Sequence, residues 1–132
     1  MDPLPGEFSE AYFTGEEPMP DWPVRFAIVT ACNPDGRIVA NAVNTEADRK
    51  LAAELERREL VHFRITGGSL DGRHQEPGWG IATHDLAVAR DLSKRYQQLA
   101  FFWIERGQLK LVDTETGEIR DLALWSERWR RS

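Results

Sequence analysis

An apolar run at residues 26–32 is the clearest pattern in this chain, and it leads directly into a short polar turn. The run reads Phe-Ala-Ile-Val-Thr-Ala-Cys without polar alternation, which predicts a strand over about residues 25–32 that is buried on both faces. Asn33-Pro34-Asp35-Gly36 then ends this strand, because proline breaks the ladder and the other three residues favour turns.

Two helices are predicted from apolar residues at helical spacing. The first begins at Thr45, with Asp48 as its capping-box partner, or has Asn44 as its N-cap. The second begins at one of the three polar residues 83–85. The inward stripes are Ala47, Leu51 and Leu55 in the first helix, and Leu86, Ala89, Leu92 and Tyr96 in the second.

The remaining segments predict strands joined by turns. Residues 60–65 alternate between apolar and polar, which is typical of a half-buried strand, and the Gly-, Ser- and Asp-rich residues 66–78 predict a loop. Residues 99–104 are apolar on both faces. Further strands are predicted at 79–83, 109–112 and 118–122.

The resulting order is β-α-β-β-α-β followed by a β-meander. We therefore expect an α+β fold, a ferredoxin-like split β-α-β sandwich extended at its C-terminal end. The alternative is a mixed α/β sheet in which residues 37–43 form an additional strand. The domain division is a Pro-rich leader at 1–24 that packs on the domain or is partly disordered, a single domain at 25–125, and a basic tail at 126–132.

Composition and charge exclude several classes of protein. No apolar run approaches the ~20 residues that a membrane span needs, and the N-terminus does not resemble a signal peptide. The single cysteine excludes an internal disulfide and favours a cytoplasmic protein. A formal net charge of −5 argues against nucleic acid as a partner.

The predicted topology gathers polar residues at one edge of the sheet. In this strand order the first and third strands are adjacent and antiparallel, so the turn after residue 32 lies beside the segment leading into residue 79. We expect a pocket for a small polar ligand there. Its candidate residues are Thr30, Asn33, Asn41, Asn44, Arg49 and Glu76. The alternative is that the Asn side chains only satisfy turn backbone and that Glu76 pairs with an Arg.

Catalytic chemistry at this edge would use Cys32, His74 or Glu76. Cys32 is a candidate nucleophile with His74 as its base and Glu76 orienting that base, although a free cysteine is more often an inert core residue. The three His residues lack the spacing of metal ligands, so neither a metal nor a cofactor is expected.

One face of such a sheet is free of helices and needs a cover. Trp22, Trp125 and Trp129, or a second copy of the chain in a homodimer, are the expected covers. Nucleic-acid stacking on this face is the less favoured alternative, since the basic-aromatic signature is absent from the sequence.

Several spaced motifs together carry a family resemblance. They are Thr30-Ala31-x-Asn33-Pro34 after an apolar strand, Asn44 followed by Leu51-x3-Leu55, Glu76-Pro77-Gly78 before a strand, and Tyr96-Gln97-Gln98-Leu99-Ala100-Phe101. Over about residues 12–112 the chain resembles the bacterial family catalogued as domain of unknown function 3293. It departs from the family pattern at Cys32, where an aromatic residue is frequent, and at Asp48, where Asn is frequent.

The leading hypothesis is a small bacterial cytoplasmic binding or interaction module, not an enzyme, with its pocket between Asn33 and Glu76. The alternatives are a small hydrolase or transferase that uses Glu76 or His74 as general base, and a homodimeric structural domain.

Overall fold

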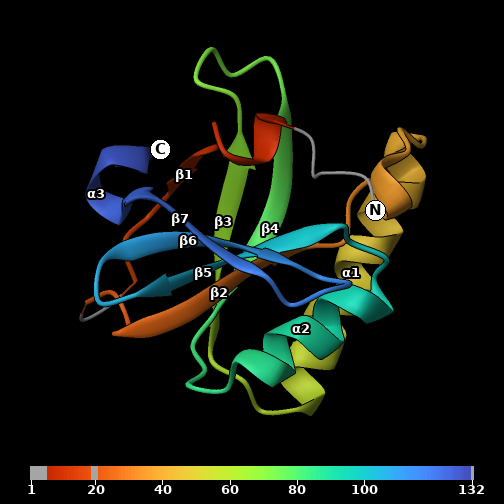
Figure 1. Ribbon diagram of the computed structural model, residues 1–132. Coiled ribbons are helices and arrows are strands. Elements are labelled where there is room, and N and C mark those ends of the chain that lie inside the picture. Colours follow the sequence, from red (N-terminus) through yellow and green to blue (C-terminus); the bar gives the residue numbers. More distant parts are fainter. Residues whose placement is uncertain (1–5, 19–20, 132) are drawn as a thin grey trace.

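The computed structural model describes residues 6–18 and 21–131, and residues 1–5, 19–20 and 132 of the predicted leader and tail lie outside this description. The described part is a mixed α/β fold with three α-helices and one curled sheet of eight strands (Figure 1). The helices are α1 (Asn41–Arg57), α2 (Leu86–Arg95) and α3 (Trp125–Arg128). The strands are β1 (Tyr12–Gly15), β2 (Arg25–Thr30), β3 (His62–Gly68), β4 (Gln75–Ile81), β5 (Ala100–Glu105), β6 (Gln108–Asp113), β7 (Ile119–Leu124) and β8 (Trp129–Arg131).

The strand order is β7-β6-β5-β2-β4-β3-β1-β8. The predicted adjacency of the first and third sequence-predicted strands is confirmed, because β2 and β4 pair antiparallel with Thr30 opposite Gly78. The sheet is wider than predicted, since β1 from the leader and β8 from the basic tail extend it beyond β3. The Pro-rich leader thus contributes a strand, Tyr12–Gly15, that was not predicted from the sequence.

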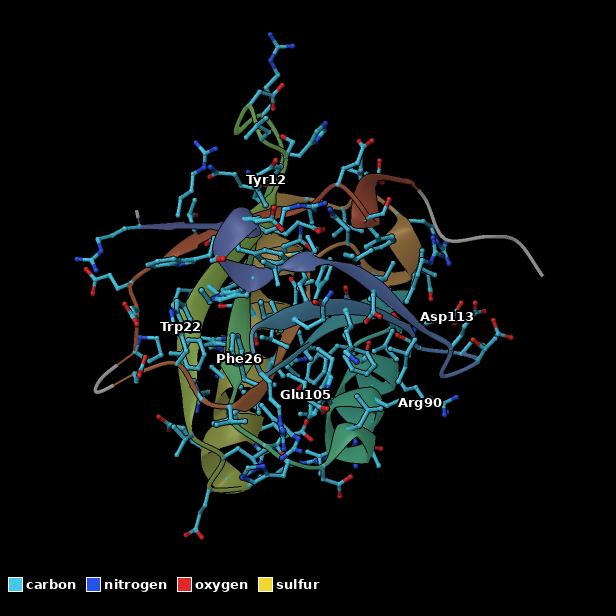
Figure 2. The ribbon with its side chains drawn as sticks, turned by 60° about the vertical axis from the view of Figure 1, so that its left-hand side comes forward. Tyr12, Trp22, Phe26, Arg90, Glu105 and Asp113 are labelled. Carbon is cyan, nitrogen blue, oxygen red and sulfur yellow. The ribbon has the colours of Figure 1, made fainter. Side chains whose placement is uncertain are left out.

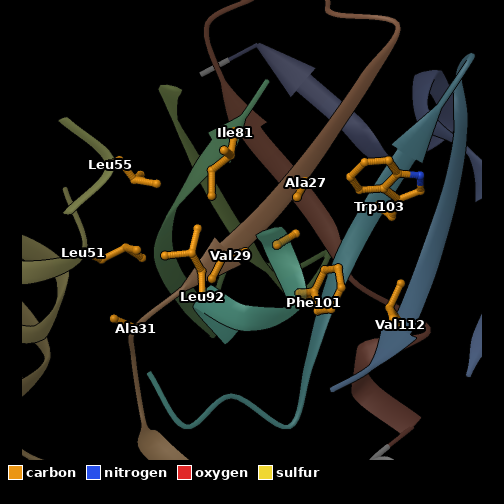
Figure 3. Close-up of a cluster of buried hydrophobic side chains, with 11 residues drawn as sticks. Ala27, Val29, Ala31, Leu51, Leu55, Ile81, Leu92, Phe101, Trp103 and Val112 are labelled. Atoms are coloured by element: carbon orange, nitrogen blue, oxygen red, sulfur yellow. The ribbon is translucent and has the colours of Figure 1, made fainter. Parts of the chain in front are cut away.

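Both long helices cover the same face of the sheet. Leu51 and Leu55 of α1 pack with Leu92 of α2 on the side chains of Ala27 and Val29 in the central strand β2 (Figure 3). All of these side chains are buried. The apolar stripes that the sequence predicted for the two helices thus form the core on this face.

The opposite face carries a layer of aromatic side chains. Phe26 and Phe63 of the sheet pack against Trp22, Trp125 and Trp129, as expected for a face covered from within the chain. The rings of Trp22 and Phe26 are stacked with centroids 5.5 Å apart, and Figure 2 places them side by side. The covering of β5 on both faces is confirmed too, because Trp103 lies in the helix-side core and Ile104 in the aromatic layer.

Two segments differ from the prediction. Residues 37–40 form neither a helix nor a strand, and α1 begins at Asn41, so the alternative strand at 37–43 is wrong and the helix starts earlier than Thr45. Ala40 is the N-cap, without a side-chain hydrogen bond. The side chains of Asn44 and Asp48 cannot cap the helix, because they bind other segments instead.

The predicted loop at 66–78 is in fact mostly strand. β3 continues to Gly68 and β4 starts at Gln75, which leaves only residues 69–74 as the hairpin loop. Gly67 and Gly68 resemble loop residues in the sequence, yet they pair with Glu76 and Gln75 across the hairpin. A side chain at Gly68 would collide with the carbonyl oxygen of His74, so glycine is required there. By contrast, Asp85 is the N-cap of α2, within the predicted range, and its carboxylate accepts a hydrogen bond from the Ala87 amide.

Candidate functional site

The turn after β2 is built around Asn33, which adopts a left-handed backbone conformation with φ 48°. Asn tolerates this conformation better than most residues that carry a side chain. The conformation directs the Asn33 amide toward α1, where it donates a 2.8 Å hydrogen bond to Oδ1 of Asn44. The turn therefore contacts α1 through a backbone amide of Asn33 and a side-chain oxygen of Asn44.

The Asn33 side chain joins three segments. Its Oδ1 accepts hydrogen bonds from Nδ2 of Asn44 (3.0 Å) and from the Val39 amide (3.3 Å). Its Nδ2 donates to Oε1 of Glu76 on β4 at 3.2 Å. We refer to Asn33, Asn44 and Glu76 as the Asn33 network. Two of the contacts satisfy turn backbone, as the predicted alternative states, because the amides of Val39 and Asn33 donate to Asn33 Oδ1 and Asn44 Oδ1. The bonds from Asn33 to Asn44 and Glu76 go further and join side chains of separate segments.

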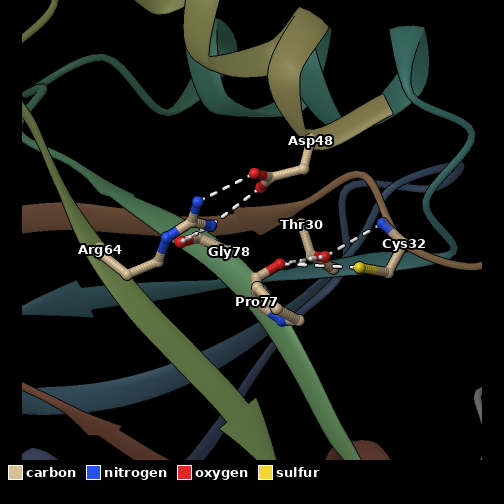
Figure 4. Close-up of polar contacts among 6 residues, drawn as sticks. All are labelled: Thr30, Cys32, Asp48, Arg64, Pro77 and Gly78. Carbon is tan, nitrogen blue, oxygen red and sulfur yellow. Dashed lines mark hydrogen bonds and ion pairs between the residues drawn. The ribbon is translucent and has the colours of Figure 1, made fainter. Parts of the chain in front are cut away.

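A second set of contacts involves Thr30, Cys32 and Pro77, which are close in sequence to Asn33 and Glu76 (Figure 4). The Thr30 hydroxyl donates to the Pro77 carbonyl at 2.9 Å and accepts a hydrogen bond from the Cys32 amide at 3.0 Å. The Cys32 thiol contacts the same carbonyl at 3.7 Å. Burial raises the pKa of the Cys32 thiol, so it stays protonated at neutral pH. This geometry favours the buried, inert cysteine over the candidate nucleophile.

Two of the predicted ligand-binding residues lie apart from the Asn33 network. Asn41 is exposed at the start of α1. The guanidinium of Arg49 is exposed and binds the carboxylate of Glu46 at 3.0 and 2.6 Å. His74 is exposed in the hairpin loop, where its backbone amide donates to Ser69 Oγ. Thr30, Asn33, Asn44 and Glu76 are the members of the predicted set that come together.

The negative charge of Glu76 is compensated by few contacts. It is half-buried, and burial raises the pKa of its carboxyl group. The negative charge of Glu7 raises this pKa further, whereas the hydrogen bond from Asn33 and the nearby His74 lower it. Within residues 6–18 and 21–131, no Arg or Lys forms an ion pair with Glu76, so the predicted alternative of an Arg partner does not hold there.

The pair formed by Arg64 and Asp48 was not predicted from the sequence. Arg64 on β3 binds Asp48 on α1 through two 2.9 Å hydrogen bonds and donates to the Gly78 carbonyl at 3.2 Å (Figure 4). Its guanidinium also lies 3.8 Å from the centroid of the Trp79 ring. Such a bidentate, stacked arrangement suits arginine and fixes α1 against the sheet. Strand alternation placed Arg64 opposite the apolar residues of β3 but did not reveal its partner.

A second polar contact that was not predicted from the sequence joins the two long helices. The carboxylate of Glu54 in α1 is buried, with 6% of the residue exposed, and it accepts a 3.0 Å hydrogen bond from the Tyr96 hydroxyl. The guanidinium groups of Arg58 and Arg95 also lie near this carboxylate, at 2.7 and 3.3 Å from Oε2 of Glu54. Removing one member of a buried charged group leaves the others uncompensated, so the loss of a single partner would weaken the contact between α1 and α2.

We expect Tyr96 to ionise only at high pH. Burial, and then the hydrogen bond to Glu54, raise the pKa of Tyr96 from 10.0 to about 12. Because the pKa is higher in the folded state, this contribution to stability is complete below pH 10 and is lost as the pH rises through about 12. An alkaline titration of tyrosinate absorbance measures it. Tyr96→Phe should remove the late transition, and Glu54→Gln should shift it to lower pH. An unshifted transition in Glu54→Gln would contradict the assignment.

Within the described ranges, no cluster of three or more His, Cys, Asp or Glu residues could hold a metal ion. In the same part of the chain, no helix combines the length and the apolar character needed to cross a membrane.

Comparison with known protein families places most of the segment from β2 to β5 in a family of unknown function. Residues 29–101 match the family described as "Protein of unknown function (DUF3293)". This segment contains every member of the Asn33 network and runs from β2 into β5. No curated protein and no solved structure matches the chain.

Proposed function

We propose that this chain, which belongs to the DUF3293 family, is a binding module that holds a small polar ligand against the carboxylate of Glu76. The family description states no activity, so the proposal depends on the chemistry of the Asn33 network. The observation that carries it is a half-buried carboxylate without a cationic partner in the described part of the chain.

The charge on Glu76 indicates the class of ligand. Placing a carboxylate in a partly buried site is unfavourable unless a cation or several hydrogen-bond donors compensate it. Oε1 accepts a hydrogen bond from Asn33, whereas Oε2 receives none from any residue of 6–18 and 21–131. A ligand that brings an ammonium, a guanidinium or paired N–H groups would supply the missing donors. Glu7 adds negative charge nearby and favours the same class of ligand.

The surroundings favour binding over catalysis. The Asn33 and Asn44 side chains already hydrogen bond to each other, and Asn33 orients Glu76. Few of their hydrogen-bond donors and acceptors are left to contact a reacting group. The thiol of Cys32 is buried and its pKa is raised. A catalytic pair of acid and base would need a second titratable group within hydrogen-bond reach of Glu76.

A hydrolase or transferase is the second candidate function, and one observation favours it. The raised pKa of Glu76 is a property of many general bases and acids. This candidate predicts turnover of an amide or nucleotide-like substrate whose rate depends on pH through the ionisation of Glu76. Retention of full turnover by Glu76→Gln would eliminate it.

We expect Glu76→Gln to weaken binding of a small cation about tenfold or more, equivalent to about 1.4 kcal/mol. Glutamine keeps an oxygen that can accept the hydrogen bond from Asn33, so the fold should be retained. The test is a thermal-shift screen with primary amines and guanidinium compounds, followed by calorimetry on the best of them. Since the pKa of Glu76 is raised, binding to the wild-type chain should weaken on acidification before an ordinary glutamate would become protonated.

Glu118→Gln is the matched control. Glu118 is exposed in the turn before β7, and its replacement changes the net charge by the same amount. Equal affinity of Glu76→Gln and wild type for the selected cation would refute the proposal. Equal weakening by Glu118→Gln would show that only overall charge matters.

A further inference from the structure

A separate cavity lies on the sheet at the end formed by β1, β3 and β8. Its volume is ≈ 80 Å³, which is room for about two to three water molecules. The lining residues come from these strands, from the start of β4 and from the hairpin loop, and none comes from a helix. Figure 2 shows Tyr12, one of the lining residues, at the end of the molecule to which this hairpin extends.

The register of the strands places five polar side chains on one face of the sheet. Tyr12 pairs with Gly68, which pairs with Gln75. Thr14 lies between Thr66 and Arg130 in the same way. Directly paired residues have their side chains on the same face, and residues two apart on one strand share that face. The five residues that line the cavity from this face are Tyr12, Thr14, Thr66, Gln75 and Arg130.

These side chains are unpaired in the part of the chain that the structure describes. The hydroxyl groups of Tyr12, Thr14 and Thr66 and the amide of Gln75 hydrogen bond to no other described residue. The Asn33 network is different, because its amide groups bond to one another. Tyr12, Thr14 and Thr66 are half-buried, whereas Gln75 and Arg130 are exposed, so a ligand entering the cavity would meet polar groups that have no partner among the described residues.

Arg130 supplies the charge. Its guanidinium lies 5.8 Å from the centroid of the Tyr12 ring, and no described carboxylate pairs with it. A cation–π contact of this kind positions a guanidinium without neutralising its charge. The guanidinium of Arg128 lies 5.3 Å from the centroid of the same ring and adds positive potential, although its Nη1 donates to the carbonyls of Ser9 and Ala11.

Gly68 lies between Tyr12 and Gln75 in the register and is one of the lining residues. The carbonyl oxygen of His74 occupies the position that a side chain at Gly68 would take, so glycine lets the hairpin backbone approach the sheet at this wall of the cavity.

We propose that this cavity binds a small oxyanion, either a carboxylate or a phosphate group, through Arg130 and the hydroxyl groups of Thr14 and Thr66. A guanidinium binds such oxyanions in a planar, bidentate manner, and hydroxyl groups donate to the remaining oxygens. The site is independent of the proposed cation site, because Gln75 and Glu76 are consecutive on β4 and point to opposite faces.

The test is an NMR titration of the full chain with inorganic phosphate and, separately, with acetate, at constant ionic strength. We expect saturable shifts of the Thr14, Gly67 and Gly68 amides with Kd on the order of millimolar. Arg130→Gln should weaken binding about tenfold or more. Tighter binding of phosphate would assign phosphorylated ligands to the site, and tighter binding of acetate would assign carboxylates.

Arg131→Gln is the matched control, because Arg131 is the next residue of β8, is exposed and does not line the cavity. Equal weakening by both substitutions, or shifts that do not saturate, would overturn the proposal. Thr66→Val is a second variant that removes a hydroxyl and keeps the side-chain shape. It should weaken binding several-fold (about 3-fold), and unchanged affinity for both anions in this variant would also overturn the proposal. Glu76→Gln should leave anion binding unchanged, so the two proposed sites can fail separately.

Discussion

Replacing Trp22 by alanine is expected to lower the free energy of unfolding by about 3 kcal/mol. The indole of Trp22 lies against four aromatic rings, those of Phe26, Phe63, Trp125 and Trp129, with centroids 5.0 to 5.8 Å away. Truncation would remove these contacts and open a cavity above Phe26, which is fully buried. Trp22 lies in the leader, before β2. The substitution therefore measures how much the leader contributes to the stability of the folded domain.

Urea unfolding at equilibrium measures this effect. Trp22→Phe retains an aromatic ring and should lose much less stability than Trp22→Ala. Leu124→Ala is the surface control, because Leu124 is an exposed apolar residue of β7, and its replacement should change the unfolding free energy by about 0.5 kcal/mol or less. A loss below about 1 kcal/mol in Trp22→Ala would mean that the leader contributes little to the aromatic layer.

Asn33→Ala should be comparably destabilising, by about 3 kcal/mol. The substitution removes the side-chain hydrogen bonds to Asn44, Val39 and Glu76. Each is worth about 1 kcal/mol, and the partly buried partner groups lose their compensation. Alanine must also adopt φ 48°, which adds about 1 kcal/mol of backbone strain, offset in part by solvent that reaches the partner groups.

Asn33→Gly separates the two contributions, because glycine adopts the left-handed conformation without strain and lacks the side-chain amide. We expect Asn33→Gly to be less destabilising than Asn33→Ala by about 1 kcal/mol. Asn41→Ala is the matched control, since Asn41 is exposed at the start of α1 and should tolerate the change. If Asn33→Ala unfolded with the same free energy as Asn41→Ala, the Asn33 network would not stabilise the fold.

The Asn33 network also determines how binding experiments are interpreted. A loss of ligand binding in Asn33→Ala would reflect a disrupted turn as much as a lost ligand contact, because this side chain holds β4, α1 and residue 39 together. Glu76→Gln changes the charge while preserving the hydrogen bond that positions the side chain. It is therefore the more specific test of the proposed cation site.

The positions of the long strands and helices follow from local patterns in the sequence. The apolar run at 26–32 predicts a central strand. β2 does lie in the middle of the sheet, and its residues 26–29 are buried on both faces of the sheet. Leu51 and Leu55 point into the core as their spacing requires. These predictions succeed because apolar residues that recur every 2 or 3.6 positions form the buried side of a strand or a helix. This spacing can be read from neighbouring residues along the chain.

Local sequence preferences predicted the wrong role for two Gly residues and for Asn44. Gly67 and Gly68 favour a loop by composition, yet the tertiary structure uses them within β3, where β1 and the hairpin approach closely. Asn44 is a good N-cap by type, but its side chain is bonded to Asn33 and the helix starts three residues earlier. In both cases a contact with a distant segment outweighs the local preference.

The sequence by itself determined the long helices, the central strands and the Trp residues that cover one face, because each depends on apolar periodicity or on large apolar side chains that must be buried. The tertiary structure alone decided which polar residues meet. It brought Asn33 to Asn44 and Glu76, left Asn41 and Arg49 outside, and paired Arg64 with Asp48. It also placed Arg130 beside Thr14 through the pairing of β1 with β8. Contacts of this kind depend on strand register and on the rotation of a helix about its axis. Both are determined by packing between residues that are far apart in the sequence.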